Sequence, residues 1–289
     1  MKKLLLASTA ALVGSAGVAV ADVALSGDGR MGVVYNSGPG NNFMFSSRAR
    51  VTFTLSGETD TGLAFGGSFR ADNAGTNGMP GNGAVNGQAG SVFISGDFGR
   101  LTMGDTNGAA QFVVGNISGV GFTGLNFYEE RTYLANPGDR RPIARYDITI
   151  DGFTVALSYT NPGSTLNDVA SIGVGYEFDG FSIGVGYENV ANGTDHWIIG
   201  GSAEFDGVTV EANYGRSGGA DQYGIGAGYS FDDIGVNAYY SRNFAGQESF
   251  GLGASYDLGG GASLVGGIVR TRATTPTSTQ ADFGITFSF

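Results

Sequence analysis

Residues 169–190 read VASIGVGYEFDGFSIGVGYENV. On both sides of Asp179-Gly180, bulky apolar residues alternate with small or polar ones. Alternation with a period of two predicts strands with one apolar face, and Asp-Gly between two such runs is a strong hairpin signal. This stretch therefore predicts two antiparallel strands, Val169–Phe178 and Phe181–Glu188, joined by a tight turn.

The same pattern recurs on both sides of this hairpin. Tight turns such as Asp151-Gly152 alternate with longer polar links such as 161–168. An even number of strands, with short turns at one end and longer loops at the other, is typical of an all-β, up-and-down outer-membrane barrel. The sixteen expected strands are 23–36, 45–57, 63–72, 89–95, 100–105, 143–150, 153–160, 169–178, 181–188, 196–205, 208–216, 223–231, 234–242, 249–258, 262–271 and 280–289.

The composition fits a barrel better than other classes. There are 53 glycines, 20 Phe, 13 Tyr and no cysteine among the 289 residues, so long helices and disulfide-stapled folds are disfavoured. A soluble β protein is the alternative. The polar strand faces are rich in glycine and charge, however, which suits a wet lumen better than a close-packed core.

The first residues predict export. A basic Met1-Lys2-Lys3, an apolar run and Ala19-Val20-Ala21 describe a secretory signal peptide over 1–21, cleaved near Ala21, ahead of a barrel over 22–289. The remainder has 13 arginines, no lysine and 26 acidic residues, a formal charge of −13 (13 − 26). Nucleic acid is therefore not an expected partner.

Residues 105–142 are the longest stretch without clean alternation. Loops this long inside a compact domain are usually functional or disordered, and we expect this one to lie inside the barrel and narrow its pore. Its apolar residues are expected to pack against the wall, namely Phe112, Val113, Val114, Phe122, Leu125 and Phe127.

Four segments carry a family resemblance. They are 23–32 (VALSGDGRMG), 45–66 (FSSRAR to GETDTGLAFG), 92–105 (VFISGDFGRLTMGD) and 283–289 (FGITFSF). In order and spacing the chain resembles the general diffusion porins of Gram-negative bacteria, most closely the alphaproteobacterial type of purple bacteria. The resemblance spans residues 22–289.

The resemblance implies a homotrimer of 16-stranded antiparallel transmembrane barrels with an inward-folded third loop. It also implies a constriction in which loop acids face wall arginines. The arginines would be Arg30, Arg48, Arg50 and Arg70, and the acids Asp105, Glu129, Glu130 and Asp139. Two alternatives stay open: the arginines pair with Asp28 or Asp72, and some acids only anchor the loop to Arg131, Arg140 or Arg145. Asp105 stands where many porins have arginine, which weakens or moves the basic cluster.

The expected activity is passive passage of ions and small hydrophilic solutes. Expected partners are outer-membrane lipid and lipopolysaccharide, and the assembly machinery that reads the C-terminal Phe289. No cofactor is expected; acidic loops leave calcium open, although no EF-hand motif is present. A substrate-specific channel with a saturable site is the main alternative. An enzyme is disfavoured because the one histidine, His196, begins a strand and suggests only a polar strand end.

Overall fold

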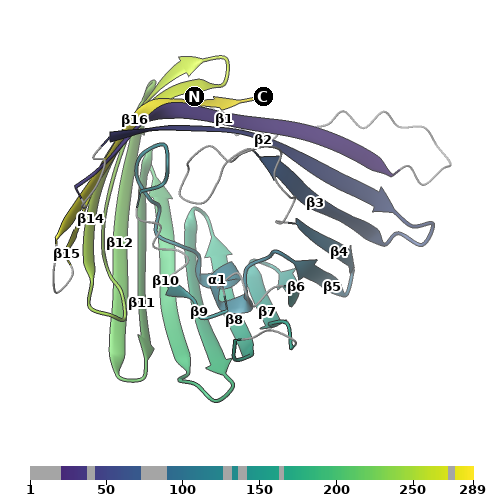
Figure 1. Ribbon diagram of the computed structural model, residues 1–289. Helices are drawn as coiled ribbons and strands as arrows, with labels where there is room; N and C mark the ends of the chain where they lie inside the picture. The colour runs from purple at the N-terminus through teal and green to yellow at the C-terminus, as the bar shows by residue number, and fades with distance from the viewer. Residues whose placement is uncertain are drawn as a thin grey trace.

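The computed structural model describes residues 21–37, 43–72, 90–125, 132–135, 142–162, 166–272 and 277–289. Sixteen antiparallel strands close into one barrel in which each strand pairs with its neighbours in sequence, and β1 pairs with β16 (Figure 1). Every predicted strand is present, with ends shifted by three residues or fewer. The predicted all-β, 16-stranded antiparallel barrel is therefore confirmed.

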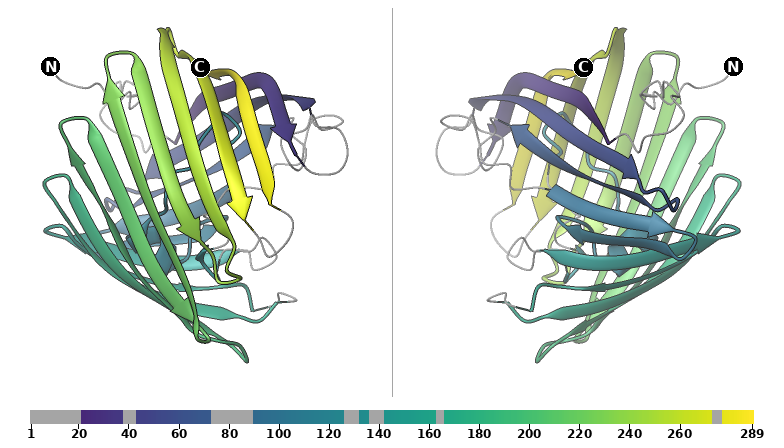
Figure 2. Two further views of the ribbon diagram at one scale, coloured as in Figure 1. Left: turned by 90° about the vertical axis from the view of Figure 1, so that its left-hand side faces the viewer. Right: turned by 90° about the vertical axis from the view of Figure 1, so that its right-hand side faces the viewer.

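The strands are β1 (Asp22–Asn36), β2 (Phe43–Glu58), β3 (Ala64–Asp72), β4 (Gly90–Gly96), β5 (Gly99–Gly104), β6 (Ile143–Ile150), β7 (Phe153–Tyr159), β8 (Val169–Phe178), β9 (Phe181–Val190), β10 (His196–Phe205), β11 (Val208–Ser217), β12 (Ala220–Phe231), β13 (Ile234–Arg242), β14 (Glu248–Gly259), β15 (Ala262–Arg272) and β16 (Ser278–Ser288). The strands run side by side around the barrel and are inclined together (Figure 2). Gly27 and Phe289 exchange backbone hydrogen bonds of 3.1 and 2.8 Å beside the β1–β16 seam.

The Asp-Gly pairs form the tight turns that the sequence predicts. Asp179 has a φ of 40° and Gly180 a φ of 80°. Two successive positive φ angles define the hairpin turn whose twist matches that of the strands, and glycine adopts the second angle without a steric cost. The turns at Asp151 and Asp206 have the same form.

Bulky apolar side chains cover the outside of the wall. On β8, Ile172 and Val174 are 42% and 45% exposed, while the intervening Gly173 and Gly175 face the interior. A soluble monomer rarely exposes a continuous apolar band around its whole circumference, but a barrel in a bilayer requires one. The outer face is therefore the lipid face.

One short helix, α1 (Ala109–Val114), lies inside the ring of strands (Figure 1). The sequence analysis expected only irregular structure there. Among the described residues, no helix is both long and apolar enough to cross a membrane.

Candidate functional site

Arginines from β2 and β3 form a line of ion pairs with two aspartates on the inner wall. The strand register places Arg50 opposite both Asp28 and Asp72. Arg50 lies 3.7 Å from Asp28 and 3.3 Å from Asp72; Arg48 also contacts Asp28, and Arg70 lies 3.6 Å from Asp72. We call Arg48, Asp28, Arg50, Asp72 and Arg70 the arginine ladder. Its formal charge is +1.

The ladder is partly open to the lumen. The side chains of Arg48 and Arg50 are about one fifth exposed, and that of Arg70 nearly half. Only the pair of Arg70 is exposed enough for water to screen it fully, and such a pair contributes about 0–1 kcal/mol to stability. The main effect of the ion pairs is to fix the guanidinium groups. The pairing with Asp28 and Asp72 that the sequence left open is the one that the structure shows.

Arg30 does not join the ladder. Its Nη1 donates a hydrogen bond of 3.1 Å to the carbonyl oxygen of Phe122, and its guanidinium lies 5.9 Å from the centre of that ring. Arg30 therefore holds a segment of the long connection rather than another wall residue.

The predicted acids are only partly described. Asp105 directly follows β5, and its backbone N–H donates to the Gly90 carbonyl at 2.8 Å. Glu129, Glu130 and Asp139 lie outside the described residues, as do Arg131, Arg140, Arg141 and Phe127. Residues 106–125, which we call the strap, carry no charged side chain.

The first half of the strap is bonded to β6, β7 and β8. Arg145 on β6 donates to Thr106 Oγ1 at 2.9 Å and to the Asn107 carbonyl at 3.0 Å. Its guanidinium also lies 3.7 Å from the centre of the Phe112 ring. Ser158 on β7 and Ser171 on β8 accept hydrogen bonds from the N–H groups that begin α1. These bonds replace the intrahelical partners that the first turn lacks.

The second half of the strap is bonded to β11, β13 and β16. Glu211 accepts from the N–H and the hydroxyl of Ser118, and Asn237 donates to the Gly119 carbonyl. Asp282, which is 6% exposed, accepts from the N–H groups of Phe122 and Thr123 at 3.3 and 2.8 Å. The strap thus follows the inner wall from β6 to the β16–β1 seam.

Glycines on the wall make room for α1. A Cβ atom added at Gly184 would lie 2.7 Å from the Val113 carbonyl oxygen, and one added at Gly173 would lie 2.5 Å from that of Ala109. Real Cβ atoms do not approach other atoms so closely. The small faces of β8 and β9 therefore serve as a cradle for the helix. The expected wall packing of Val113, Val114, Phe122 and Leu125 agrees with these contacts, and Phe112, although 40% exposed, lies against Arg145 of β6.

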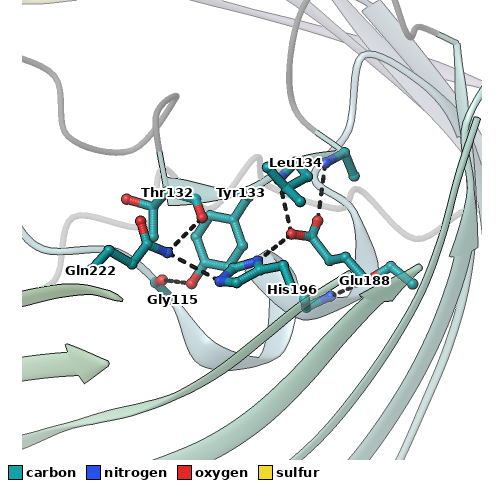
Figure 3. Close-up of polar contacts among 10 residues, drawn as sticks. Gly115, Thr132, Tyr133, Leu134, Glu188, His196 and Gln222 are labelled. Atoms are coloured by element: carbon teal, nitrogen blue, oxygen red, sulfur yellow. Dashed lines mark hydrogen bonds and ion pairs between the residues drawn. The ribbon is translucent and has the colours of Figure 1, made fainter. Parts of the chain in front are cut away.

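A second piece of the long connection, residues 132–135, is held by a buried polar cluster of Glu188, His196 and Gln222 (Figure 3). Four anchors were not predicted from the sequence, namely Glu188, Glu211, Gln222 and Asp282. Each is a polar residue on the small face of a strand, and this signal could have singled them out. Their partners lie 53 to 160 residues away in the chain, so the pattern alone does not identify them.

Tyrosines at the loop end of the wall donate to nearby aspartates. Tyr159, Tyr187 and Tyr214 bond Asp168, Asp195 and Asp221 at 3.0, 2.6 and 2.9 Å. The bond from Tyr187 lowers the pKa of Asp195, which lies in the loop before β10. Amphipathic rings are enriched at membrane–water interfaces, so this row marks one rim of the bilayer.

No group of three or more Asp, Glu, His or Cys residues within the described ranges is placed to hold a metal ion. The expectation about cofactors and calcium stays a prediction.

Comparison with known proteins agrees with this architecture. A model of the Gram-negative porin family matches residues 7–276. A porin of Rhodobacter capsulatus is 34% identical, with 93% of this chain and 100% of that protein covered.

Solved structures give the same result. A porin refined at 1.8 Å resolution has a TM-score of 0.75 at 30% identity, with 93% of this chain and 100% of that chain covered. A triple mutant of Rhodopseudomonas blastica porin shares the fold with a TM-score of 0.75 at 24% identity and the same coverage. The strands cross the outer membrane and enclose a channel, and the chain belongs to the Gram-negative porin family.

Proposed function

We propose that the strap and the arginine ladder together form the narrow part of a general diffusion pore. The observation that carries this proposal is the continuous bonding of the strap to the inner wall, from Arg145 on β6 to Asp282 on β16. A barrel of sixteen strands without such an insertion encloses a wide aqueous channel. A strap that occupies part of the lumen therefore limits which solutes pass.

The ladder supplies the field in this narrow part. Its three guanidinium groups are fixed by two carboxylates and face water, so a local positive potential acts on passing ions. The proposal places Asp105, Glu129, Glu130 and Asp139 opposite the ladder, as the family resemblance implies. The uncharged strap supports this assignment, because any acid of the long connection must come from outside residues 106–125.

Planar-bilayer recordings of the purified protein test the pore. We expect ohmic steps whose conductance rises with salt and is not saturated by sugars. A saturable block by one solute would favour a substrate-specific channel, and an absence of steps would contradict the proposal. Arg50→Ala should shift ion selectivity toward cations and Glu130→Gln toward anions. Unchanged reversal potentials in both variants would refute the assigned constriction.

The proposal includes a homotrimer. Strands β4, β5, β6 and β7 contain 7, 6, 8 and 7 residues, whereas a tilted membrane strand needs about 9–11. This low side of the wall is the side that a partner subunit would cover. Conductance steps in groups of three, together with a trimer mass by light scattering, would support this state. A monomer mass with full activity would exclude it.

Export and assembly complete the proposal. The first strand begins at Asp22, directly after the expected cleavage near Ala21, so mature protein should yield Asp22 on N-terminal sequencing. Phe289 is 82% exposed and accessible to the assembly machinery. Deletion of Phe289 should reduce the amount of folded protein in the outer membrane, where lipid and lipopolysaccharide surround it.

Catalysis is not part of the proposal. His196 Nδ1 lies 2.6 Å from Glu188 and its Nε2 lies 3.1 Å from Gln222, and the side chain has no exposed surface. A histidine with both nitrogens engaged and no access to solute cannot serve as a general base for that solute.

A further inference from the structure

Three polar side chains that face the interior are completely buried next to each other. Glu188 on β9, His196 on β10 and Gln222 on β12 each have 0% exposure, although a lumen wall is normally wet (Figure 3). Burying polar groups is costly unless each has a partner, so a cluster of this kind needs a reason. We call these three residues the latch.

The latch holds residues 132–135 by their backbone. The two carboxylate oxygens of Glu188 accept hydrogen bonds from the N–H groups of Leu134 and Ala135, at 2.8 and 3.0 Å. The amide nitrogen of Gln222 donates to the Thr132 carbonyl at 2.8 Å.

Tyr133 connects this segment to the strap. Its hydroxyl donates to the Gly115 carbonyl at 2.5 Å, and its ring packs with Ala110, Val114 and Ile198. The latch therefore positions residues 132–135 directly and the end of α1 through Tyr133.

The hydrogen-bond partners define the state of His196. Because the Thr132 carbonyl can only accept, the Gln222 atom facing it is the NH2 group. That same NH2 group lies 3.1 Å from His196 Nε2, which must then be an acceptor. The proton of the neutral ring is consequently on Nδ1, from which it is donated to Glu188 at 2.6 Å.

A second proton on the ring does not fit this arrangement. A proton on Nε2 would face the NH2 group of Gln222, so two donors would oppose each other. If the amide turned over, its oxygen would face the Thr132 carbonyl and that bond would be lost. The imidazole occupies the space beside Gly215 of β11, where an added Cβ would lie 2.6 Å from Nε2.

Among the described residues, the other neighbours of the imidazole do not offer Nε2 an alternative acceptor. Tyr133 and Phe244 present their rings, with centroids 6.3 and 5.2 Å from that of His196. In the described part of the chain, Glu188 is the charged group that contacts the imidazole, and it is bound at Nδ1. Asp195 precedes His196 but bonds Tyr187 and Asn189.

We propose that Glu188, His196 and Gln222 form a proton-sensitive latch, in which a neutral His196 keeps residues 132–135 against the wall and its protonation releases Thr132. These three are positioning residues, since they act on the pore through residues 132–135 and α1. The inference rests on the proposed function, because the strap affects conductance only if it narrows the pore. The expected consequence is a pore whose current becomes unsteady in acid.

The test compares current fluctuations in planar bilayers from about pH 8 to about pH 5, where an ordinary histidine titrates. For the wild type, the frequency of transient current changes should rise about tenfold for each unit by which the pH falls, until half of the His196 side chains are protonated. This slope is expected because one proton operates each latch. His196→Gln should remove this dependence, since a glutamine amide can donate to Glu188 and accept from Gln222 but does not titrate. Asp195→Asn is the matched control and should keep the wild-type profile.

A second measurement does not depend on any variant. Because His196 is the only histidine, ¹⁵N NMR of histidine-labelled, untagged protein reports its state directly. We expect the Nδ1–H tautomer at neutral pH and a protonation midpoint equal to that of the current fluctuations. An Nε2–H tautomer, or midpoints that differ, would overturn the proposal.

The outcomes separate this proposal from the proposed function. Ohmic pores with a flat pH profile, or a His196→Gln variant with the wild-type profile, overturn the latch and leave the diffusion pore intact. A protein that forms no pores at any pH would refute the proposed function, and the latch with it.

Discussion

The arginine ladder and the anchors of the strap use charge in opposite ways. In the ladder, Arg50 and its neighbours pair with carboxylates, and their side chains stay partly open to water. Among the anchors, Asp282 and Glu188 pair with backbone N–H groups and are almost completely buried. Under the proposed function, charges that pair with each other shape the field of the pore, whereas charges that pair with the backbone determine where the strap lies.

This difference predicts that the two groups fail differently when they are mutated. Loss of a ladder residue should change selectivity at little cost in stability, because water replaces the missing partner. Loss of an anchor should destabilise the strap, because buried donors are left without an acceptor.

The largest effect is expected for Asp282→Ala. It leaves the N–H groups of Phe122 and Thr123 unpaired, at a cost of about 1–3 kcal/mol for each buried donor. Arg70→Ala at the exposed end of the ladder should cost about 0–1 kcal/mol. Denaturant unfolding of both variants in detergent measures the difference. Equal losses of unfolding free energy would remove the distinction between anchor and ladder.

A somewhat smaller effect is expected in the glycine cradle. Gly184→Ala forces its methyl group against the Val113 carbonyl, an overpacking that costs about 1–3 kcal/mol. Gly228→Ala is a matched control on the interior face of β12, where the nearest atom would lie 3.8 Å away. The unfolding free energy of Gly184→Ala should be lower than that of Gly228→Ala. A control that is destabilised as much as Gly184→Ala would argue against the cradle.

Arg30→Ala tests the one predicted wall arginine that lies outside the ladder. It removes the hydrogen bond to the Phe122 carbonyl, worth about 1 kcal/mol, and the contact with the Phe122 ring. We expect noisier single-channel currents with a modest change in reversal potential, and the opposite pattern for Arg70→Ala. If both variants shift selectivity alike and leave the noise unchanged, Arg30 acts as a ladder residue.

The smallest effect is expected at the rim. The hydroxyl of Tyr187 lowers the pKa of Asp195, so the bond stabilises the folded protein above the unfolded pKa of about 4 and is lost as pH falls through the lower folded value. Tyr187→Phe should raise the pKa of Asp195 and destabilise the protein slightly at neutral pH only. In an Asp195→Asn background, Tyr187→Phe should no longer change stability in a pH-dependent way. If the pH dependence persists in that background, a group other than Asp195 causes it.

The sequence was sufficient for the barrel because the signals for it are local. Alternation around Ile172 and Val174 shows which face meets lipid, and Asp179-Gly180 specifies the turn and register of the hairpin. Each strand could therefore be predicted from about ten residues, and the number of strands in the barrel follows by adding the predicted strands.

The anchors could not be predicted because their contacts depend on closure of the whole barrel. Asp282 meets Phe122 across 160 residues, and it does so only once β16 has paired with β1. Similarly, the sequence around Gly184 does not distinguish it from other small residues of the inner face, because its close contact with α1 forms only in the folded barrel. The four predicted arginines came from the family resemblance, but the separate contact of Arg30 follows only from the path of the strap.

The position of the strap in the lumen can be tested most directly with a single cysteine, since the chain has none. Gly119 is an exposed strap residue where an added Cβ would meet no atom closer than 4.0 Å. Modification of Gly119→Cys with a bulky sulfonated thiol reagent should lower the single-channel conductance, while modification of Ile225→Cys on the lipid face should not. Complete labelling of Gly119→Cys with unchanged conductance would contradict a strap that narrows the pore.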